Sequence, residues 1–153
     1  MSADARIQEL NLTLPPVPQP LAKYRPAVRQ GNLLYLSGHL PLLADGKFIT
    51  GCVGEDLTVE QGYQAAKQCG LAILSTVKTS LGSLNKVRRL IKTIGLVNCP
   101  PGFADQPKVI NGFSELMAQV FGDDAGVGAR SALGAGSLPA NAAVEIECMF
   151  EVE

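Results

Sequence analysis

The last stretch of the chain shows the most regular alternation of apolar and charged residues. Apolar side chains occupy every second position from Val144 to Val152, and glutamate occupies four of the five positions that follow them. A period of two residues is typical of a β-strand that is buried on one side only. The sequence therefore predicts a last strand with an apolar side toward the core and an acidic side, including Glu145 and Glu147, facing away from it.

Two internal stretches carry apolar residues three and four positions apart, the pattern of an amphipathic helix. The first follows Thr58, which begins a capping box with Gln61, and it ends before Gly82. The second follows Asp105, a candidate N-cap residue, and ends before Gly122. Each helix is thus delimited by its own start and stop signals.

Four further stretches rich in aliphatic and β-branched residues predict strands over residues 33–40, 47–53, 86–97 and 129–137. The Asp45-Gly46 turn predicts a hairpin between the first two of them. The resulting order, β-β-α-β-α-β-β, predicts an α+β domain with two helices packed on one face of a mixed sheet. Because the other sheet face lacks a helix to cover it, we also expect a homo-oligomer.

The N-terminal residues 1–23 differ from the rest in their prolines, four of which lie between positions 15 and 20. Such a stretch cannot form a helix or a central strand. We expect residues 1–23 to form an extended arm that lies on the surface or crosses to a neighbouring copy, with a floppy tail as the alternative. Residues 24–153 then form a single domain, which suits the length of the chain.

Composition narrows the possible functions. The 13 basic and 14 acidic residues give a net charge of -1, and there is no Trp, so the chain lacks the basic excess and aromatic platforms of nucleic-acid-binding proteins. The four cysteines form no C-x-x-C pair and there is one histidine, so we expect no metal site. The polar start and the lack of a long apolar run predict no membrane association and a cytoplasmic protein with reduced thiols.

The strongest candidate chemistry is an arginine and a glutamate near the C-terminus. Arg130 stands fifteen residues before Glu145, which begins the acidic row. A guanidinium can hold a substrate carboxylate through two hydrogen bonds, and a carboxylate can handle a water or a proton. If they meet on neighbouring strands, the arginine should lower the pKa of Glu145. The alternatives are a purely structural ion pair of Arg130 with Glu145 or Glu147, and a solvated acidic strand face.

With these residues in view, the chain resembles the RidA/YjgF family, also labelled endoribonuclease L-PSP. The resemblance covers residues 24–153. Its matching pieces are Tyr24, Ala27-Val28, Gly31 to Gly38, Asn111, Ala129-Arg130-Ser131, Leu138-Pro139 and Val144 to Glu147.

The resemblance implies a chorismate-mutase-like fold, assembled as a homotrimer with clefts between subunits. It implies hydrolysis of reactive enamine or imine intermediates such as 2-aminoacrylate to 2-oxo acids and ammonia, without a metal or organic cofactor. Arg130 would grip the carboxylate of a small substrate, and Glu145 would orient or activate the water. The other residues that the resemblance assigns to the pocket are Tyr24, Ser37, Gly38 and Asn111.

The chain also departs from the family pattern. Ala132 stands where the archetypal deaminases carry cysteine, Tyr24 to Ala27 differs from their Tyr-Ser-Gln-Ala, and the linker over residues 98–108 is longer. A non-catalytic protein that binds a small carboxylate in the same cleft is therefore the alternative. A ribonuclease is disfavoured by the neutral charge and the single histidine, His39, which we expect to be structural.

Overall fold

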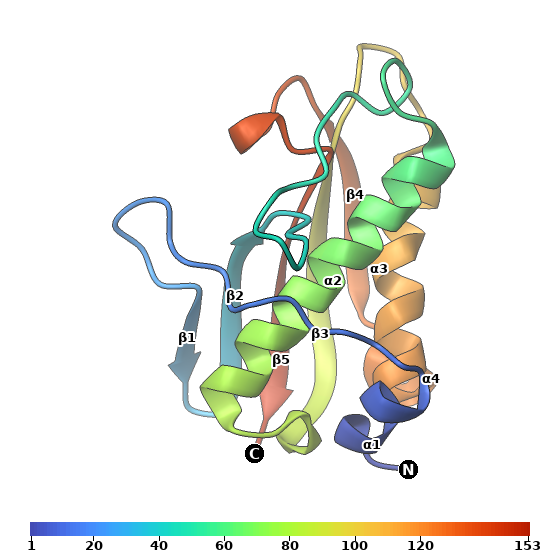
Figure 1. Ribbon diagram of the computed structural model, residues 1–153. Coiled ribbons are helices and arrows are strands. Elements are labelled where there is room, and N and C mark those ends of the chain that lie inside the picture. Colours follow the sequence, from blue (N-terminus) through green and yellow to red (C-terminus); the bar gives the residue numbers. More distant parts are fainter.

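Five strands form one mixed sheet in the order β1-β2-β5-β3-β4 in the computed structural model, which describes residues 1–153 (Figure 1). The strands are β1 (Ala27–Gln30), β2 (Leu33–His39), β3 (Val87–Asn98), β4 (Ala129–Ala135) and β5 (Val144–Val152). Only β3 and β4 run parallel, and the other neighbours are antiparallel. The predicted α+β class is therefore confirmed, with the C-terminal strand in the middle of the sheet.

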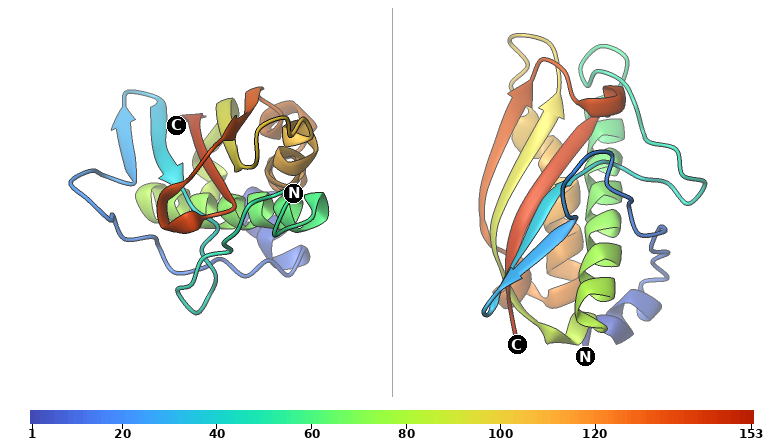
Figure 2. Two further views of the ribbon diagram at one scale, coloured as in Figure 1. Left: turned by 90° about the horizontal axis from the view of Figure 1, so that it is seen from above. Right: turned by 90° about the vertical axis from the view of Figure 1, so that its left-hand side faces the viewer.

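Two long helices cover one face of the sheet and leave the other face bare (Figure 2). They are α2 (Val59–Leu81) and α3 (Gln106–Phe121), and the short helices are α1 (Ala3–Glu9) and α4 (Asp123–Gly126). The capping box at the start of α2 is confirmed, since the Thr58 hydroxyl accepts from the Gln61 N–H at 3.1 Å and the Gln61 side chain accepts from the Thr58 N–H at 2.8 Å. Gly82 ends α2 in the left-handed conformation, with φ of 81°.

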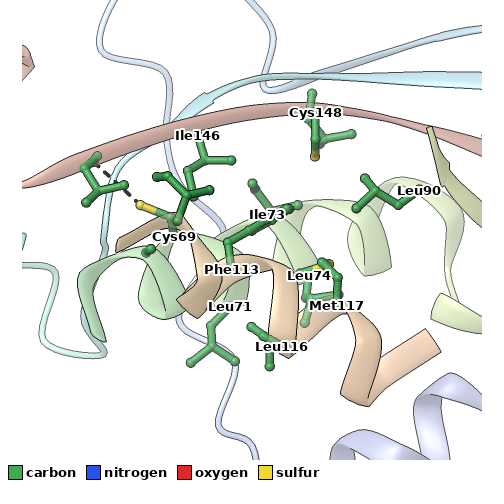
Figure 3. Packing of buried hydrophobic residues seen from close by; sticks show 14 of the residues in the cluster. Cys69, Leu71, Ile73, Leu74, Leu90, Phe113, Leu116, Met117, Ile146 and Cys148 are labelled. Carbon is green, nitrogen blue, oxygen red and sulfur yellow. Dashed lines mark hydrogen bonds between the residues drawn. The ribbon is translucent and has the colours of Figure 1, made fainter. Parts of the chain in front are cut away.

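The core lies between the two long helices and the covered face of the sheet (Figure 3). The apolar row of β5 is buried as predicted, and its Ile146 and Phe150 pack with Ile73 and Phe113 of the helices. Gly112 lets the helices approach closely, because a Cβ atom there would lie 2.0 Å from the Tyr63 carbonyl oxygen of α2. The acidic side of β5 consequently faces away from the helices.

The prediction of a strand over 47–53 is wrong, and the first hairpin lies earlier in the chain. It joins β1 to β2 through Gly31 and Asn32, with φ of 60° at Gly31. β1 and β5 occupy the two edges of β2, so residues 47–53 cannot pair with it. The Asp45-Gly46 turn itself forms, with a 2.8 Å bond from the Leu43 N–H to the Lys47 carbonyl. Beyond that turn the segment bonds to residues 141–143, as in the 3.0 Å bond from the Ala143 N–H to the Ile49 carbonyl.

The N-terminal arm is helical over Ala3–Glu9, where an extended chain was expected. The prolines constrain only their own segment, and the residues before them form α1, with Ile7 buried and Asp4 paired to Lys78 of α2 at 3.2 Å. The proline segment has neither helix nor strand and crosses the outer side of α2 (Figure 1). There the Ser75 hydroxyl donates to the Pro15 carbonyl at 2.5 Å.

None of the helices combines the length and apolar character that a membrane span requires.

Candidate active site in two parts

A β-bulge near the end of β2 creates the first part of the site. The pairing of β2 with β5 shifts between Leu36 and His39, so Ser37 and Gly38 together lie opposite one β5 residue. Such bulges bend a strand and re-aim its side chains. The Ser37 hydroxyl donates to the Arg25 carbonyl at 2.6 Å, which fastens the bulge to the segment before β1.

The carboxyl group of Glu145 lies directly over Gly38. A Cβ atom built on Gly38 would stand 2.2 Å from Oε1 of Glu145, far closer than any real contact. Glycine is therefore required here by the space that the carboxyl group takes, not by an unusual backbone angle.

Glu145 and Gly38 lie at one side of an open hollow of about 540 Å³, here called the Glu145 pocket. Its lining residues are Leu21, Ala22, Tyr24, Ser37, Gly38, Leu40, Pro139, Glu145 and Glu147. Four of the six residues assigned to the site from the sequence thus meet in one place. The Tyr24 hydroxyl accepts a 3.4 Å hydrogen bond from the Leu21 N–H, which joins two parts of the pocket wall.

The environment of Glu145 raises its pKa, contrary to the expectation of a lowered one. Burial is the larger cause, because it penalises the charged form, and the negative charge of Glu147 is the second. The expected arginine is missing from this environment: the salt bridges of the chain do not include Glu145. A carboxyl group with a raised pKa can both accept and return a proton closer to neutral pH.

Arg130 forms the second part of the site, on the edge strand β4. Its Nη1 donates to Oδ1 of Asn111 at 2.9 Å and to the Ser114 hydroxyl at 3.1 Å, and its Nη2 makes a long 3.5 Å contact with the Pro107 carbonyl. The first half of α3 thus fixes the guanidinium by one of its nitrogens. The donors of Nε and Nη2, which form the fork that suits a carboxylate, are engaged by only that long contact.

Ser114 is a site residue that the sequence analysis missed. It follows Asn111 by three positions on the same helix, and residues at that spacing share a helix face. Once Asn111 is assigned to the pocket, this spacing is the signal that could have identified Ser114.

The two parts do not meet within one chain. Strand β3 lies between β4 and β5, so the expectation that Arg130 and Glu145 stand on neighbouring strands is wrong. Arg130 reaches the helix on the covered side of the sheet, whereas Glu145 faces the bare side. The same geometry excludes a structural ion pair between Arg130 and Glu145 or Glu147 within one chain.

His39 has a structural role, as expected. Its ring is buried, with Nδ1 at 2.6 Å from the Ser37 carbonyl and Nε2 at 2.9 Å from the Thr76 hydroxyl. Burial lowers the pKa of His39, so the neutral ring links β2 to α2. No three His, Cys, Asp or Glu side chains are grouped so that they could hold a metal ion.

Comparisons with known proteins agree on the fold and the family. A family model described as "YjgF/chorismate mutase-like, putative endoribonuclease" matches residues 4–152. Protein TCP17 of Trypanosoma cruzi is 39% identical over 148 residues, with 97% of this chain and 92% of that protein covered. A crystal structure of a protein of unknown function from Agrobacterium tumefaciens superposes with a TM-score of 0.89 at 45% identity, covering 99% of this chain and 94% of that one. A 2-iminobutanoate/2-iminopropanoate deaminase of Dermatophagoides farinae is 27% identical over 143 residues, covering 93% of this chain and 95% of that protein.

Proposed function

The chain belongs to the RidA/YjgF family, and from that membership and the two-part site we propose that it hydrolyses enamine or imine derivatives of 2-oxo acids to the 2-oxo acid and ammonia. The observation that carries the proposal is the Glu145 pocket, where a half-buried carboxyl group of raised pKa lies over Gly38 beside an open hollow. The similarity to an imine deaminase gives the reaction class its support.

The chemistry needs one proton carrier and one anion holder. An enamine first takes a proton at carbon and becomes the imine. The oxygen of a water molecule then bonds to the imine carbon, and Glu145 accepts a proton from that water. Glu145 returns the proton to nitrogen, which gives a carbinolamine. Glu145 then carries the hydroxyl proton of the carbinolamine to nitrogen as the C–N bond breaks, so that the carbonyl forms and ammonia leaves. The imine carbon is already electrophilic, so positioning and proton transfer are sufficient catalysis.

We propose that Arg130 supplies the anion holder from a second copy of the chain. Its side chain belongs to the edge strand β4 and forms no salt bridge, and the Glu145 pocket opens on the bare sheet face. A contact that joins the β4 edge of one copy to the bare face of the next is heterologous. It can close into a ring such as a trimer, with one complete site at each contact.

Generating the substrate in the assay tests the reaction itself. A lyase that releases 2-aminoacrylate, or an amino-acid oxidase with catalase, supplies the short-lived compound, and the appearance of 2-oxo acid is compared with and without the protein. The proposal predicts acceleration over spontaneous hydrolysis that Arg130→Ala and Glu145→Gln both abolish. Binding of a 2-oxo acid without any acceleration would favour the non-catalytic alternative instead.

Mixing two inactive variants tests whether the site is shared between copies. Arg130→Ala and Glu145→Ala proteins are combined, dissociated and allowed to reassemble. A random ring has an intact Arg130 and an intact Glu145 at about one quarter of its contacts, so about one quarter of the wild-type activity should return. If the mixture stays as inactive as its components, the two residues do not act across a subunit contact.

The departure at Ala132 concerns the Arg130 part of the site. Its methyl group packs against the core beneath α3, on the same side of β4 as Arg130. It therefore contacts apolar neighbours, not the Glu145 pocket.

A further inference from the structure

One wall of the Glu145 pocket comes from the end of the N-terminal arm and is apolar. Leu21 and Ala22 of the arm line the hollow together with Tyr24 and Leu40. Leu21 remains 68% exposed and Tyr24 45% exposed in the free chain, which is high for side chains of their size. Exposed apolar surface therefore lies beside the candidate catalytic carboxyl group, and a bound ligand could cover that apolar surface.

The arm is held in place firmly enough to form a wall. The Pro15 carbonyl is bonded to Ser75 of α2, and prolines at 16, 18 and 20 limit the backbone between that anchor and Leu21. The 3.4 Å bond from the Leu21 N–H to the Tyr24 hydroxyl joins the far end to the segment before β1, which the Ser37–Arg25 bond fastens to β2. An apolar surface that is ordered before binding loses little entropy when a ligand covers it.

The pocket therefore has a polar end and an apolar end. Glu145, Glu147 and Ser37 supply the polar groups, and the arm supplies apolar surface beyond them. In an imine of a 2-oxo acid, the reacting carbon is bonded to the carboxylate on one side and to the side chain on the other. A substrate with its reacting carbon at Glu145 and its carboxylate at Arg130 of a second copy directs its side chain toward the remaining apolar wall.

We infer that the apolar end of the Glu145 pocket is a subsite for an aliphatic substrate side chain, and that Leu21 is its specificity-determining residue. This inference rests on the proposed function, and it narrows the substrate class to imines with branched or longer aliphatic side chains. A methyl or methylene side chain is too short to cover Leu21 and gains nothing from it.

The size of the preference follows from the carbons that the subsite covers. The imine of 4-methyl-2-oxopentanoate has three more carbons than the imine of 2-oxopropanoate. Full burial of each additional carbon raises kcat/KM by about fourfold, so three carbons raise it by about 60-fold in total. The pocket is open on one side, so about half of that free energy is realised, which corresponds to a preference of about eightfold in kcat/KM.

Turnover of the two imines is measured side by side. An amino-acid oxidase with catalase generates each imine from its amino acid, and spontaneous hydrolysis is subtracted. Wild-type protein should favour the longer imine about eightfold, and Leu21→Ala should reduce the preference to about twofold. Leu10→Ala, a change of the same kind elsewhere on the arm and outside the pocket lining, should leave it unchanged. Equal kcat/KM for the two imines overturns the subsite while leaving the proposed function intact.

Binding of the product acids decides the subsite even if turnover fails. The Kd values of 2-oxopropanoate and 4-methyl-2-oxopentanoate are measured by calorimetry on the wild-type, Leu21→Ala and Leu10→Ala proteins. Tighter binding of the longer acid that is lost only in Leu21→Ala supports the subsite. Equal Kd values, or a preference that survives Leu21→Ala, overturn it. Absence of turnover with either imine counts against the proposed function alone.

Discussion

Replacing Gly38 with alanine is the most direct test of the geometry at Glu145. The added Cβ atom would stand 2.2 Å from Oε1 and 3.0 Å from Cδ of the Glu145 carboxyl group, whereas ordinary contacts begin near 3.4 Å. The carboxyl oxygen must therefore move by about 1 Å or rotate away. The carboxyl group is the end of a flexible side chain, so it can move without disturbing the sheet.

The consequences for activity and for stability should then differ. A displacement of about 1 Å in a catalytic group can cost about 100-fold in rate, so we expect kcat/KM for imine hydrolysis to fall by about that factor. Stability should change little, because alanine lowers the entropy of the unfolded chain and offsets part of the crowding. At this chain length, a change of about 1 kcal/mol shifts Tm by about 2–4 °C.

The assay compares kcat/KM and Tm for Gly38→Ala with those for Gly136→Ala, a matched control. A Cβ atom at Gly136 would meet nothing within 4 Å, so that variant should keep both values. In a Glu145→Ala background, Gly38→Ala should cause no further loss, because the group it displaces is gone. The reasoning is refuted if Gly38→Ala keeps wild-type activity, or if the loss persists without Glu145.

Three further outcomes follow from the same site. Glu145→Gln should lower kcat by about 10²–10⁴. It should also raise Tm at pH 8 but not at pH 4, because the raised pKa of Glu145 means that the neutral form, which the fold favours, is lost as pH rises. Scanning calorimetry at both pH values checks this sign. Arg130→Lys should raise KM by about tenfold or more while Tm stays unchanged, since an ammonium group cannot hold a carboxylate by two parallel bonds. The double variant Asn111→Ala/Ser114→Ala should also raise KM about tenfold while kcat stays nearly unchanged, because both bonds that hold Nη1 of Arg130 are removed. Ser114→Thr keeps a hydroxyl group at position 114 and should therefore show most of the wild-type KM effect of that position.

The features that could be predicted from the sequence are those set by neighbouring residues. The capping box at Thr58 and the stop at Gly82 need only the residues around them, and both are found in the structure. The alternation in β5 identified a strand with one buried side and placed Glu145 on the other side. The family motif assigned Tyr24, Ser37 and Gly38 to one site with Glu145, without any knowledge of how the strands pair. The structure places these four residues around one pocket.

The errors concern features decided by competition between distant segments. The Asp45-Gly46 turn forms as its local signal predicts, but it joins residues 41–43 to 47–49. Residues 47–53 cannot pair with β2, because β2 has only two edges and β1 and β5 occupy them. The first residues of the arm lie close to prolines in sequence, but Ile7 gains burial against the core and Asp4 gains a cation in Lys78, so they form a helix. Propensity near the prolines could not reveal either partner.

The separation of Arg130 from Glu145 has its origin in the same competition. The chain between them, residues 131–144, leaves the edge strand β4, passes β3 and enters the sheet between β3 and β2. Arg130 lies on the helix-covered side of its strand and Glu145 on the bare side, so no adjustment of the loop between them could bring the two side chains together. If one reaction uses both residues, the distance between their side chains is set by the contact between two copies of the chain and not by the fold of one copy. The glutamate then has a pKa raised by its own chain, and the cation that a bound carboxylate requires arrives only with the second copy.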